Sequence, residues 1–539
     1  MSQHFGDNEY NRYGSAAFSD EYDLARAGMF KQTRNSLFVG FYDNRPIFYH
    51  GQGGVLLCAG ARGGKLTTSL AFNLCAGICR GPIVALDMKG ELAAISQNQT
   101  SDNKFNIYWN AARLHGLPQH RINPVDYINI NNPALVSEVK TFVQNMVPLS
   151  GSANADYFER RAQEFLEGII LTLVRMKHVL TLPDIYHAIN LIPGNSDEWI
   201  DFAFEMSESG FPVSKRVEEE IAASRESSSN GFQGILGEMF KAFSCLSDPV
   251  LLESVSPPYD FSFADLCGKQ AYQVYLMPPA EYIDAWSPVI KAMFVAGMIY
   301  KARKPQAPRQ TWFIDECAAL KGFPLIIKLY SLGAGMGILP VTVWQSLFQM
   351  RALGPDAENI ISSSSSLQIY FAIRDLTTAR TISSMIGAES LVYDDEIRQE
   401  RARHAKRQAM QSILNGGDVF SAGLDYAHHK QAAEMQVKQK RMLREPDEVL
   451  NMANDKAFIF TDDLPKPLYA DRKPYYEQRF MAGRYHPNPY HPPLDQVLVK
   501  TWFGKKWRDV ITEPVPERYA HYPQYKNGTW SRIDGGWAW

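Results

Sequence analysis

The stretch Val55-Leu-Leu-Cys-Ala-Gly-Ala-Arg-Gly-Gly-Lys65 decides the fold expected for this chain. An apolar run of strand length leads into a glycine-rich turn that ends in Gly64-Lys65, and a helical segment follows. Backbone N–H groups and the positive end of a helix bind phosphate in such a turn, so the stretch predicts a phosphate-binding loop. We expect donors around Arg62 to Lys65 to surround a β-phosphate, with Lys65 reaching the β- and γ-phosphates. The alternative is a strand-to-helix turn without a ligand.

Two positions depart from the usual loop pattern GxxxxGK[ST]. Ala59 stands at the first glycine position, and Leu66 stands where a serine or threonine normally holds Mg²⁺. A leucine side chain has no atom that can ligate a metal. Thr67 or Thr68 is the candidate substitute, although each points about 100° further around the helix. The candidate nucleotide-binding residues are Ala59, Gly60, Arg62, Gly63, Gly64, Lys65, Leu66 and Thr67.

Short apolar runs alternate with helical patterns on both sides of this loop. Such alternation predicts a parallel sheet that is covered by helices on both faces. Residues 36–50 predict a hairpin before the loop, with its turn at Asp43-Asn44. Pro340 lies inside one run and lacks the N–H of a central strand, so we expect a bulge or a late strand start there. The runs cover residues 55–58, 83–86, 272–277, 312–314, 338–343 and 367–371.

Two adjacent acids, Asp315 and Glu316, follow the apolar run 312–314. At the carboxyl end of a buried strand, this pair is typical of a Walker B element. Asp315 would hold Mg²⁺ through water, and Glu316 would polarise the attacking water. Two acids at the N-terminus of a helix are the alternative interpretation.

Two further predicted strands end in polar residues. Gln345 follows the run 338–343 and suits a γ-phosphate sensor, although a solvent-facing strand end is an equal alternative. Asp87, Lys89 and Glu91 follow the run 83–86 in a charged turn near the loop. That turn is either part of the site or a local ion pair.

Between residues 140 and 262 no strand run is found, and residues 157–176 carry apolar side chains at helical spacing. We therefore expect an all-helical insertion within an α/β domain. The predicted division is a flexible arm (1–35), the first part of a nucleotide-binding domain (36–140), an all-α insertion (141–262), the second part of the nucleotide-binding domain (263–482) and a proline- and aromatic-rich extension over other surfaces (483–539).

The composition is that of a globular protein, with 45% hydrophobic and 21% charged residues among 539. The net charge of −3 shows no overall basic excess, so contact with DNA requires a local patch. A polar helix predicted over 394–414 is one candidate. Its cations are Arg398, Arg401, Arg403, Lys406 and Arg407. The helix is either a solvated surface or an arm that grips phosphates.

The cysteines and apolar runs indicate the environment of the chain. None of the six cysteines forms a CxxC pair, which favours reduced thiols in the cytoplasm. No apolar run reaches the length of about 20 residues that a spanning helix needs, and no signal peptide is found. His428-His429 and the other histidines lack metal-site spacing, and we expect them in loops or on the surface.

Together, these motifs resemble the type IV secretion coupling proteins, which are ring ATPases that bring conjugative DNA and effector proteins to a secretion channel. The shared elements, in the family's order, are the hairpin before the loop, Arg62 with Gly64-Lys65, LDMKGE (86–91), Phe158 with Arg161-Ala162-Gln163, DECAAL (315–320), Gln345, DLTTARTISSMIG (375–387) and the segment 441–449. They cover roughly residues 36–482.

The resemblance implies an α/β fold: a RecA-like P-loop NTPase with a mostly parallel central sheet flanked by helices and an inserted all-α domain. It implies ATP and Mg²⁺ as cofactors, with Lys65, Glu316 and Gln345 as catalytic residues and Asp315 and Thr67 near the metal. Its implied partners are single- or double-stranded DNA, secreted proteins with adaptors and components of the channel. A hexameric ring at the cytoplasmic face of the inner membrane is expected, reached through a membrane-anchored partner.

Ala59 and the missing hydroxyl after Lys65, together with two further departures, keep alternatives open. Family members commonly begin with transmembrane helices, which this chain lacks, and residues 331–337 contain no arginine finger. Arg351, Arg374, Arg380 and Arg62 are the substitute candidates. We expect a monomer or weak oligomer in dilute solution, and a hexameric ring only with DNA, nucleotide or a membrane partner. The alternatives to a secretion motor are a weakly active or inactive docking platform for secretion substrates and a DNA-pumping ATPase outside secretion.

Overall fold

The computed structural model describes residues 15–534 except 76, 98–103, 195, 228–229, 394–395, 415–423, 425–426 and 428–436. The chain divides into two compact units. The larger unit comprises Glu21–Ala372, Asn454–Asp463 and Ala470–Trp539. The smaller unit comprises Met1–Asp20, Ile373–Ala453 and Leu464–Tyr469.

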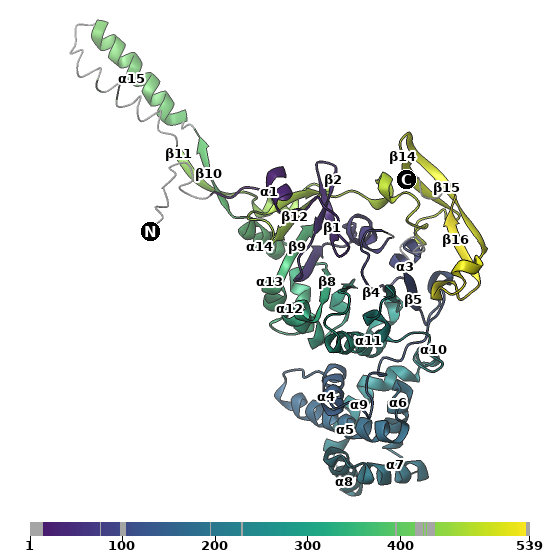
Figure 1. The fold of residues 1–539 in the computed structure, drawn as a ribbon. Helices are drawn as coiled ribbons and strands as arrows, with labels where there is room; N and C mark the ends of the chain where they lie inside the picture. Colours follow the sequence, from purple (N-terminus) through teal and green to yellow (C-terminus); the bar gives the residue numbers. More distant parts are fainter. Residues whose placement is uncertain are drawn as a thin grey trace. The chain divides into compact units, whose positions relative to one another are not determined.

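An eleven-stranded sheet forms the centre of the larger unit, in the order β2-β1-β13-β12-β9-β3-β8-β7-β4-β6-β5 (Figure 1). The strands from β9 to β5 are parallel, which confirms the expected α/β fold with a mostly parallel sheet. Its strands are β1 (Leu37–Tyr42), β2 (Arg45–Tyr49), β3 (Gly54–Ala59), β4 (Ile83–Leu86), β5 (Phe105–Trp109), β6 (Tyr272–Leu276), β7 (Gln310–Ile314), β8 (Ile338–Trp344), β9 (Ser365–Phe371), β12 (Lys456–Thr461) and β13 (Leu468–Asp471).

The central strands are continuous apolar runs because both faces of the sheet are covered. All residues of β3, β4, β7 and β8 are buried. The predicted hairpin is present as β1 and β2, with Asp43 and Asn44 at positive φ in its turn. Pro340 pairs in unbroken register with Trp312 of β7, whereas the ladder with β3 starts one residue later, at Val341. The pairing of β8 with β3 therefore begins one residue later than its pairing with β7, and β8 contains no bulge at Pro340.

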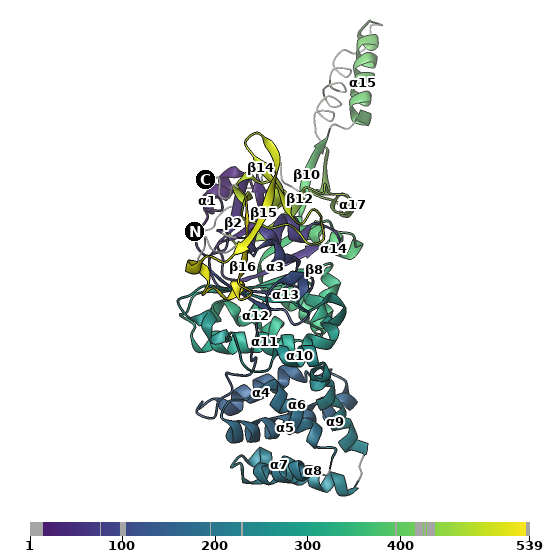
Figure 2. The same cartoon turned by 90° about the vertical axis from the view of Figure 1, so that its right-hand side faces the viewer.

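Seven helices follow one another between β5 and β6, and the described residues among them contain no strand. They lie together at one end of the larger unit (Figures 1 and 2). Helix α5 is central because its apolar stripe, with Leu166, Ile169 and Ile170, is fully buried. The helices are α4 (Leu135–Met146), α5 (Ala153–Lys177), α6 (Leu182–Leu191), α7 (Asp197–Glu208), α8 (Pro212–Ser227), α9 (Asn230–Phe243) and α10 (Pro249–Ser254).

The other α-helices of the larger unit connect strands of the sheet, except α1, which precedes β1. They are α1 (Glu21–Arg26), α2 (Ala71–Leu74), α3 (Glu91–Ile95), α11 (Ile283–Arg303), α12 (Pro324–Met336) and α13 (Ala357–Ser364). Across the described part of the chain, every helix is too short or too polar to cross a bilayer.

Residues 21–35 differ from the predicted flexible arm. They begin with α1, and both Leu24 and Met29 are fully buried. The N–H of Phe48 donates to the carbonyl of Met29 at 2.7 Å, which ties this segment to β2. The polar composition of the N-terminus concealed these two apolar anchors.

The smaller unit holds the segment around the predicted polar helix. Strand β10 (Ala388–Tyr393) pairs with β11 (Val437–Met442), next to α14 (Leu376–Ile386) and α17 (Pro446–Leu450). The polar helix is present as α15 (Glu396–Leu414). Arg403, Lys406 and Arg407 are exposed on it, which fits both of its interpretations. The side chains of Arg398 and Arg401, and all of His428 and His429, lie outside the described residues.

The C-terminal extension contains a three-stranded sheet that the sequence did not predict. Strands β14 (Gln496–Thr501), β15 (Gly504–Pro514) and β16 (Thr529–Ile533) are antiparallel neighbours. The extension docks on the edge strand β5 through Gln524. The side-chain amide of Gln524 accepts from the N–H of Asn106 at 3.0 Å and donates to the carbonyl of Lys104 at 3.2 Å, as a neighbouring strand would.

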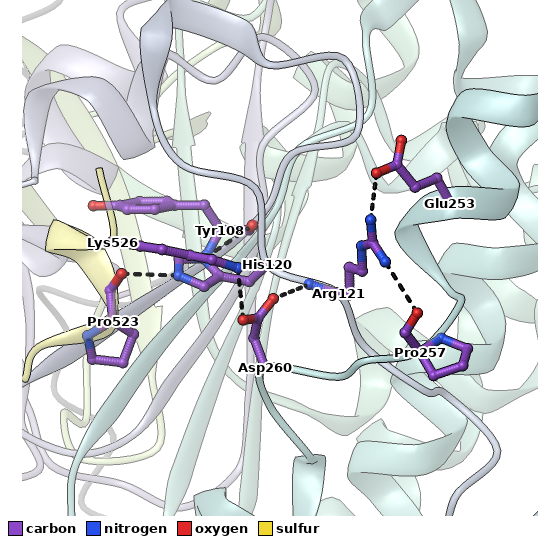
Figure 3. A network of polar contacts seen from close by, with 8 residues as sticks. All are labelled: Tyr108, His120, Arg121, Glu253, Pro257, Asp260, Pro523 and Lys526. Atoms are coloured by element: carbon purple, nitrogen blue, oxygen red, sulfur yellow. Dashed lines mark hydrogen bonds and ion pairs between the residues drawn. The ribbon is translucent and has the colours of Figure 1, made fainter. Parts of the chain in front are cut away.

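A second set of contacts holds the same extension (Figure 3). Nδ1 of His120 accepts from the N–H of Tyr108, so Nε2 carries the proton and donates to the carbonyl of Pro523 at 2.9 Å. Asp260 accepts from the N–H of Arg121 at 2.8 Å and from Lys526 at 2.7 Å. Burial opposes ionisation of Asp260, but these donors outweigh it and lower its pKa.

Candidate nucleotide-binding site

Four neighbouring strands of the larger unit end at the same edge of the sheet. Strand β8 lies between β3 and β7, and β4 follows β7. The carboxyl ends of parallel strands meet at one edge, where ligands commonly bind in α/β proteins. The residues that follow the four strands are the loop 60–65, Gln345, Asp315-Glu316 and Asp87, and we call this group the strand-end site.

The loop after β3 has the strained backbone of a phosphate-binding turn. Arg62 and Gly64 both adopt positive φ, at 57° and 81°. A Cβ on Gly63 would lie 2.9 Å from the carbonyl oxygen of Gly60 and 2.9 Å from Cβ of Ala372, so only glycine fits there. Ala59, in place of the first glycine, is buried inside β3. The helix that follows opens with a π-turn over Leu66–Leu70, a feature frequent at functional sites.

The two threonines of this helix turn their hydroxyls back onto the loop. Thr67 and Thr68 donate to the carbonyl of Gly64 at 3.2 and 2.9 Å. The longer bond of Thr67 is the easier to exchange for another ligand. Leu66 offers no oxygen.

Arg472 is a functional candidate that the sequence did not reveal. It follows β13, and its guanidinium donates to the carbonyl of Gly63 at 2.5 Å and to the hydroxyl of Thr68 at 2.8 Å. The guanidinium also stacks 3.4 Å from the centre of the Phe371 ring. Burial lowers the pKa of Arg472 to about 10, which leaves it charged at neutral pH. Its only sequence signal is a cation directly after a strand, which is common on protein surfaces.

Lys65, Glu316 and Gln345 converge. Nζ of Lys65 lies 3.8 Å from a carboxylate oxygen of Glu316. The amide of Gln345 donates to both oxygens of the same carboxylate, at 2.8 and 2.9 Å. Glu316 adopts a left-handed backbone with φ of 52°, a conformation that costs about 1–3 kcal/mol in a non-glycine residue. Such strain is typical of functional sites and aims this carboxylate at the loop.

Two buried carboxyls lie behind this trio. Burial raises the pKa of Asp315; the cation of Lys65 opposes this shift, and Glu316 adds to it. Burial also raises the pKa of Asp87 to about 7, against the N–H of Ala93, which donates to its carboxylate at 2.8 Å. The site is therefore rich in carboxyls that compete for few cations, and it favours an added positive charge.

The turn that carries Lys89 and Glu91 is held by the C-terminal extension. Asn488 donates to the Glu91 carboxylate at 2.5 Å, and the hydroxyl of Tyr490 donates to the carbonyl of Lys89 at 3.2 Å. Glu91 therefore bonds outward to the extension.

The four candidate arginines lie in different places. Arg62 is exposed on the loop. Arg351 pairs with Glu358 at 2.8 Å in the larger unit. Arg374 and Arg380 belong to the smaller unit, where both are exposed.

The donor set suits a metal that arrives with a nucleotide. Within the described residues, no group of three or more histidines, cysteines, aspartates and glutamates is placed to hold a metal ion. Asp315 and the Thr67 hydroxyl supply three side-chain oxygens at most. Mg²⁺ is usually bound by one or two carboxylates together with substrate phosphates and water, so the residues present fit it.

Comparison with known proteins decides the family. Residues 9–413, well over half of the chain, match the model of the family described as type IV secretory system conjugative DNA transfer. The chain belongs to this family. The resemblance inferred from the motifs is confirmed, and membership places this conjugative DNA transfer protein with the coupling proteins of type IV secretion systems. No curated protein matches the sequence.

Solved structures of coupling proteins share the fold of this conjugative DNA transfer protein. The bacterial conjugative coupling protein TrwBdeltaN70, in complex with sulphate, is 14% identical with a TM-score of 0.56. The plasmid coupling protein TrwB in complex with ADP and Mg²⁺ is 14% identical with a TM-score of 0.55. Each alignment covers 86% of this chain and 96% of the other. The fold is thus that of the RecA-like P-loop NTPases, as expected.

Proposed function

We propose that this conjugative DNA transfer protein is a coupling ATPase, which drives DNA or protein substrates toward a type IV secretion channel. The observation that carries the proposal is the convergence of Lys65, Glu316 and Gln345 beside the glycine-rich loop. The TrwB structures in complex with ADP and Mg²⁺, and with the ATP analogue ADPNP, support ATP and Mg²⁺ as the ligands.

Nucleotide binding is assigned to residues 59–67. Backbone N–H groups of the loop and the ammonium of Lys65 meet the phosphates. The 3.8 Å contact between Lys65 and Glu316 is long for an ion pair, so Lys65 turns to a phosphate at little cost. Asp315 and Thr67 would hold Mg²⁺, which would neutralise part of the phosphate charge. Asp87, Lys89 and Glu91 border the site.

Hydrolysis is assigned to Glu316 as the proton acceptor of the attacking water. Gln345 occupies both oxygens of that carboxylate in this structure. These bonds use two of the roughly four acceptor sites of the carboxylate, so Glu316 can still accept a proton from a water. We assign to Gln345 the role of γ-phosphate sensor.

The assembly is proposed as a homo-hexamer in which an arginine from the neighbouring subunit completes the site. Arg351, Arg374, Arg380 and Arg62 are the candidates. Partners are single- or double-stranded DNA, secreted proteins with their adaptors and channel components. A membrane-anchored partner would bring the protein to the cytoplasmic face of the inner membrane.

ATP turnover of the purified protein, with and without single-stranded or duplex DNA, tests this function. We expect DNA to raise the rate, and Glu316→Gln to lower it by orders of magnitude. Glu253→Gln, which removes an exposed carboxylate outside the strand-end site, is the matched control. No turnover under any of these conditions, with ATP still bound, would point to a docking platform.

A further inference from the structure

The turn between β14 and β15 presents large apolar side chains to solvent. Trp502 is 78% exposed, Phe503 92% and Trp507 52%. Exposed aromatic side chains on this scale have a large unfavourable contact with water, and a cluster of them marks an interaction site. We call residues 498–508 the hairpin tip.

The residue types in the turn indicate that these aromatics have a role other than folding. Thr501 pairs with Gly504, so Trp502 and Phe503 form a two-residue loop. Such loops prefer Asn, Asp and Gly, which supply the required backbone and tolerate water. The loop is instead closed by the Thr501 hydroxyl, which donates to the carbonyl of Gly504 at 2.9 Å, and by Gly504 at φ of 108°. The two aromatics at the apex break this local rule and stay 78% and 92% exposed.

Cations surround the aromatics. The sequence of the hairpin tip contains no acid, and it carries Lys500, Lys505, Lys506 and Arg508. Lys500 and Lys505 lie directly opposite one another on the two strands, an arrangement that destabilises a hairpin in water. Glu477 bonds Lys505 at 2.6 Å and offsets part of this repulsion. The guanidinium of Arg479 lies 3.1 Å from the centre of the Trp502 ring and adds another charge at its base.

The hairpin tip projects from a fixed base. In Figures 1 and 2, β14 and β15 extend from the end of the larger unit opposite to the α4–α9 helices. The extension is tied to β5 through Gln524, and to the segments that flank the sheet through His120 and Asp260. A tip held in this way loses little conformational entropy when it binds a flat surface.

We propose that the hairpin tip is a membrane-docking element that inserts Trp502 and Phe503 into the interface of an anionic bilayer. Tryptophan is enriched at that depth because its ring is amphipathic, and nearby lysines and arginines attract anionic headgroups. Two aromatics beside clustered cations supply the two weak signals that stable peripheral binding needs. This inference does not rest on the proposed ATPase.

A nucleic acid fits the hairpin tip less well. Single-stranded DNA binds in a groove that follows the backbone, with aromatics spaced to stack successive bases. Here the aromatics stand on the convex apex of a hairpin. One face of the Trp502 ring is already covered by Arg479.

Flotation of the full-length protein with vesicles, without nucleotide, tests the proposal. We expect binding to phosphatidylglycerol/phosphatidylethanolamine vesicles to exceed binding to phosphatidylcholine vesicles by about tenfold or more, because several cations contribute. The double variant Trp502→Ser/Phe503→Ser loses that binding and keeps its affinity for ATP. Phe204→Ser, which removes an exposed aromatic from α7, is the matched control and keeps both.

Quenching by brominated lipids locates the inserted ring. The protein contains ten tryptophans, so the quenching lost in Trp502→Phe identifies the share of Trp502. Vesicle binding that is equal for the parent and the double variant would overturn the proposal. So would a double variant that loses affinity for a single-stranded oligonucleotide and keeps vesicle binding, which would assign the hairpin tip to nucleic acid.

Discussion

The strand-end site and the C-terminal extension are both held by buried or half-buried polar groups, but the contacts differ in kind. Around Glu316 in the strand-end site, side chains bond to side chains, as Gln345 and Lys65 do. Where the extension docks on β5, a side chain bonds to backbone groups, as Gln524 does to Asn106 and Lys104. A side-chain pair exchanges partners at little cost when a ligand arrives, whereas a buried backbone group without a partner is expensive.

Because of this difference, we expect substitutions in the two regions to affect function and stability differently. Changes in the strand-end site are expected to alter ligand binding and turnover with little effect on unfolding. Changes in the anchors of the extension are expected to do the reverse. Substitutions in the two regions separate these effects.

Gln524→Ala is expected to lower stability most. It removes the two bonds that Gln524 makes with the N–H of Asn106 and the carbonyl of Lys104 at the edge of β5, at a cost of about 3 kcal/mol. Denaturant unfolding measures the loss. Gln496→Ala, which removes an exposed amide bonded to Asp509 in the same extension, is the control and should cost less than about 1 kcal/mol. Equal losses of unfolding free energy in Gln524→Ala and Gln496→Ala would show that the contacts of Gln524 do not anchor the extension.

Lys65→Ala is expected to weaken ATP binding by roughly thirtyfold, about 2 kcal/mol, because a charged hydrogen bond to phosphate is lost. Unfolding should change little. Calorimetric titration compares it with Lys304→Ala, an exposed lysine after α11. If Lys65→Ala binds ATP with unchanged affinity, the loop is not part of the nucleotide-binding site.

The buried His486 is expected to make stability depend on pH. Burial lowers its pKa to about 4, and its Nε2 lies 2.9 Å from the hydroxyl of Ser531. The unfolded chain then binds a proton that the folded chain refuses, so stability falls as pH drops from about 6.5 to 4, by roughly 1 kcal/mol per pH unit. His486→Gln should flatten this part of the profile. His187→Gln, which changes a mostly exposed histidine, should leave it unchanged.

Leu66→Ser is expected to have the smallest effect. It places a hydroxyl where phosphate-binding loops usually ligate Mg²⁺, and should tighten Mg-nucleotide binding by less than about tenfold. Titrations with and without Mg²⁺ separate the metal contribution. An affinity that stays the same or falls would mean that Thr67, Thr68 or water already completes the metal shell.

The sequence predicted what local chemistry encodes. The loop 59–65 and the acids after β7 could be predicted because the strand, the turn and the charged residues of each motif are consecutive in the sequence. The central strands were visible as apolar runs. Strand β5 was missed because its five residues include Asn106, whose side chain is buried among polar partners.

Contacts between residues far apart in the chain could not be predicted from the sequence. Arg472 reaches the loop from 409 residues further along the chain, and Gln524 reaches β5 from 418 residues away. Both are single polar residues in unremarkable surroundings. The exposed hairpin tip was equally hidden, since aromatics in a sequence usually predict burial. The domain limits, such as 141–262 for the helical insertion, stay a prediction.

Recovery of the bound nucleotide tests the central claim most directly. The parent protein and Glu316→Gln are each incubated with ATP, Mg²⁺ and DNA, separated from free nucleotide and analysed for ATP and ADP. The account predicts ADP on the parent and intact ATP on Glu316→Gln, because the loop still binds while the proton acceptor is gone. ADP on both would contradict the role of Glu316, and no nucleotide on either would contradict the strand-end site itself.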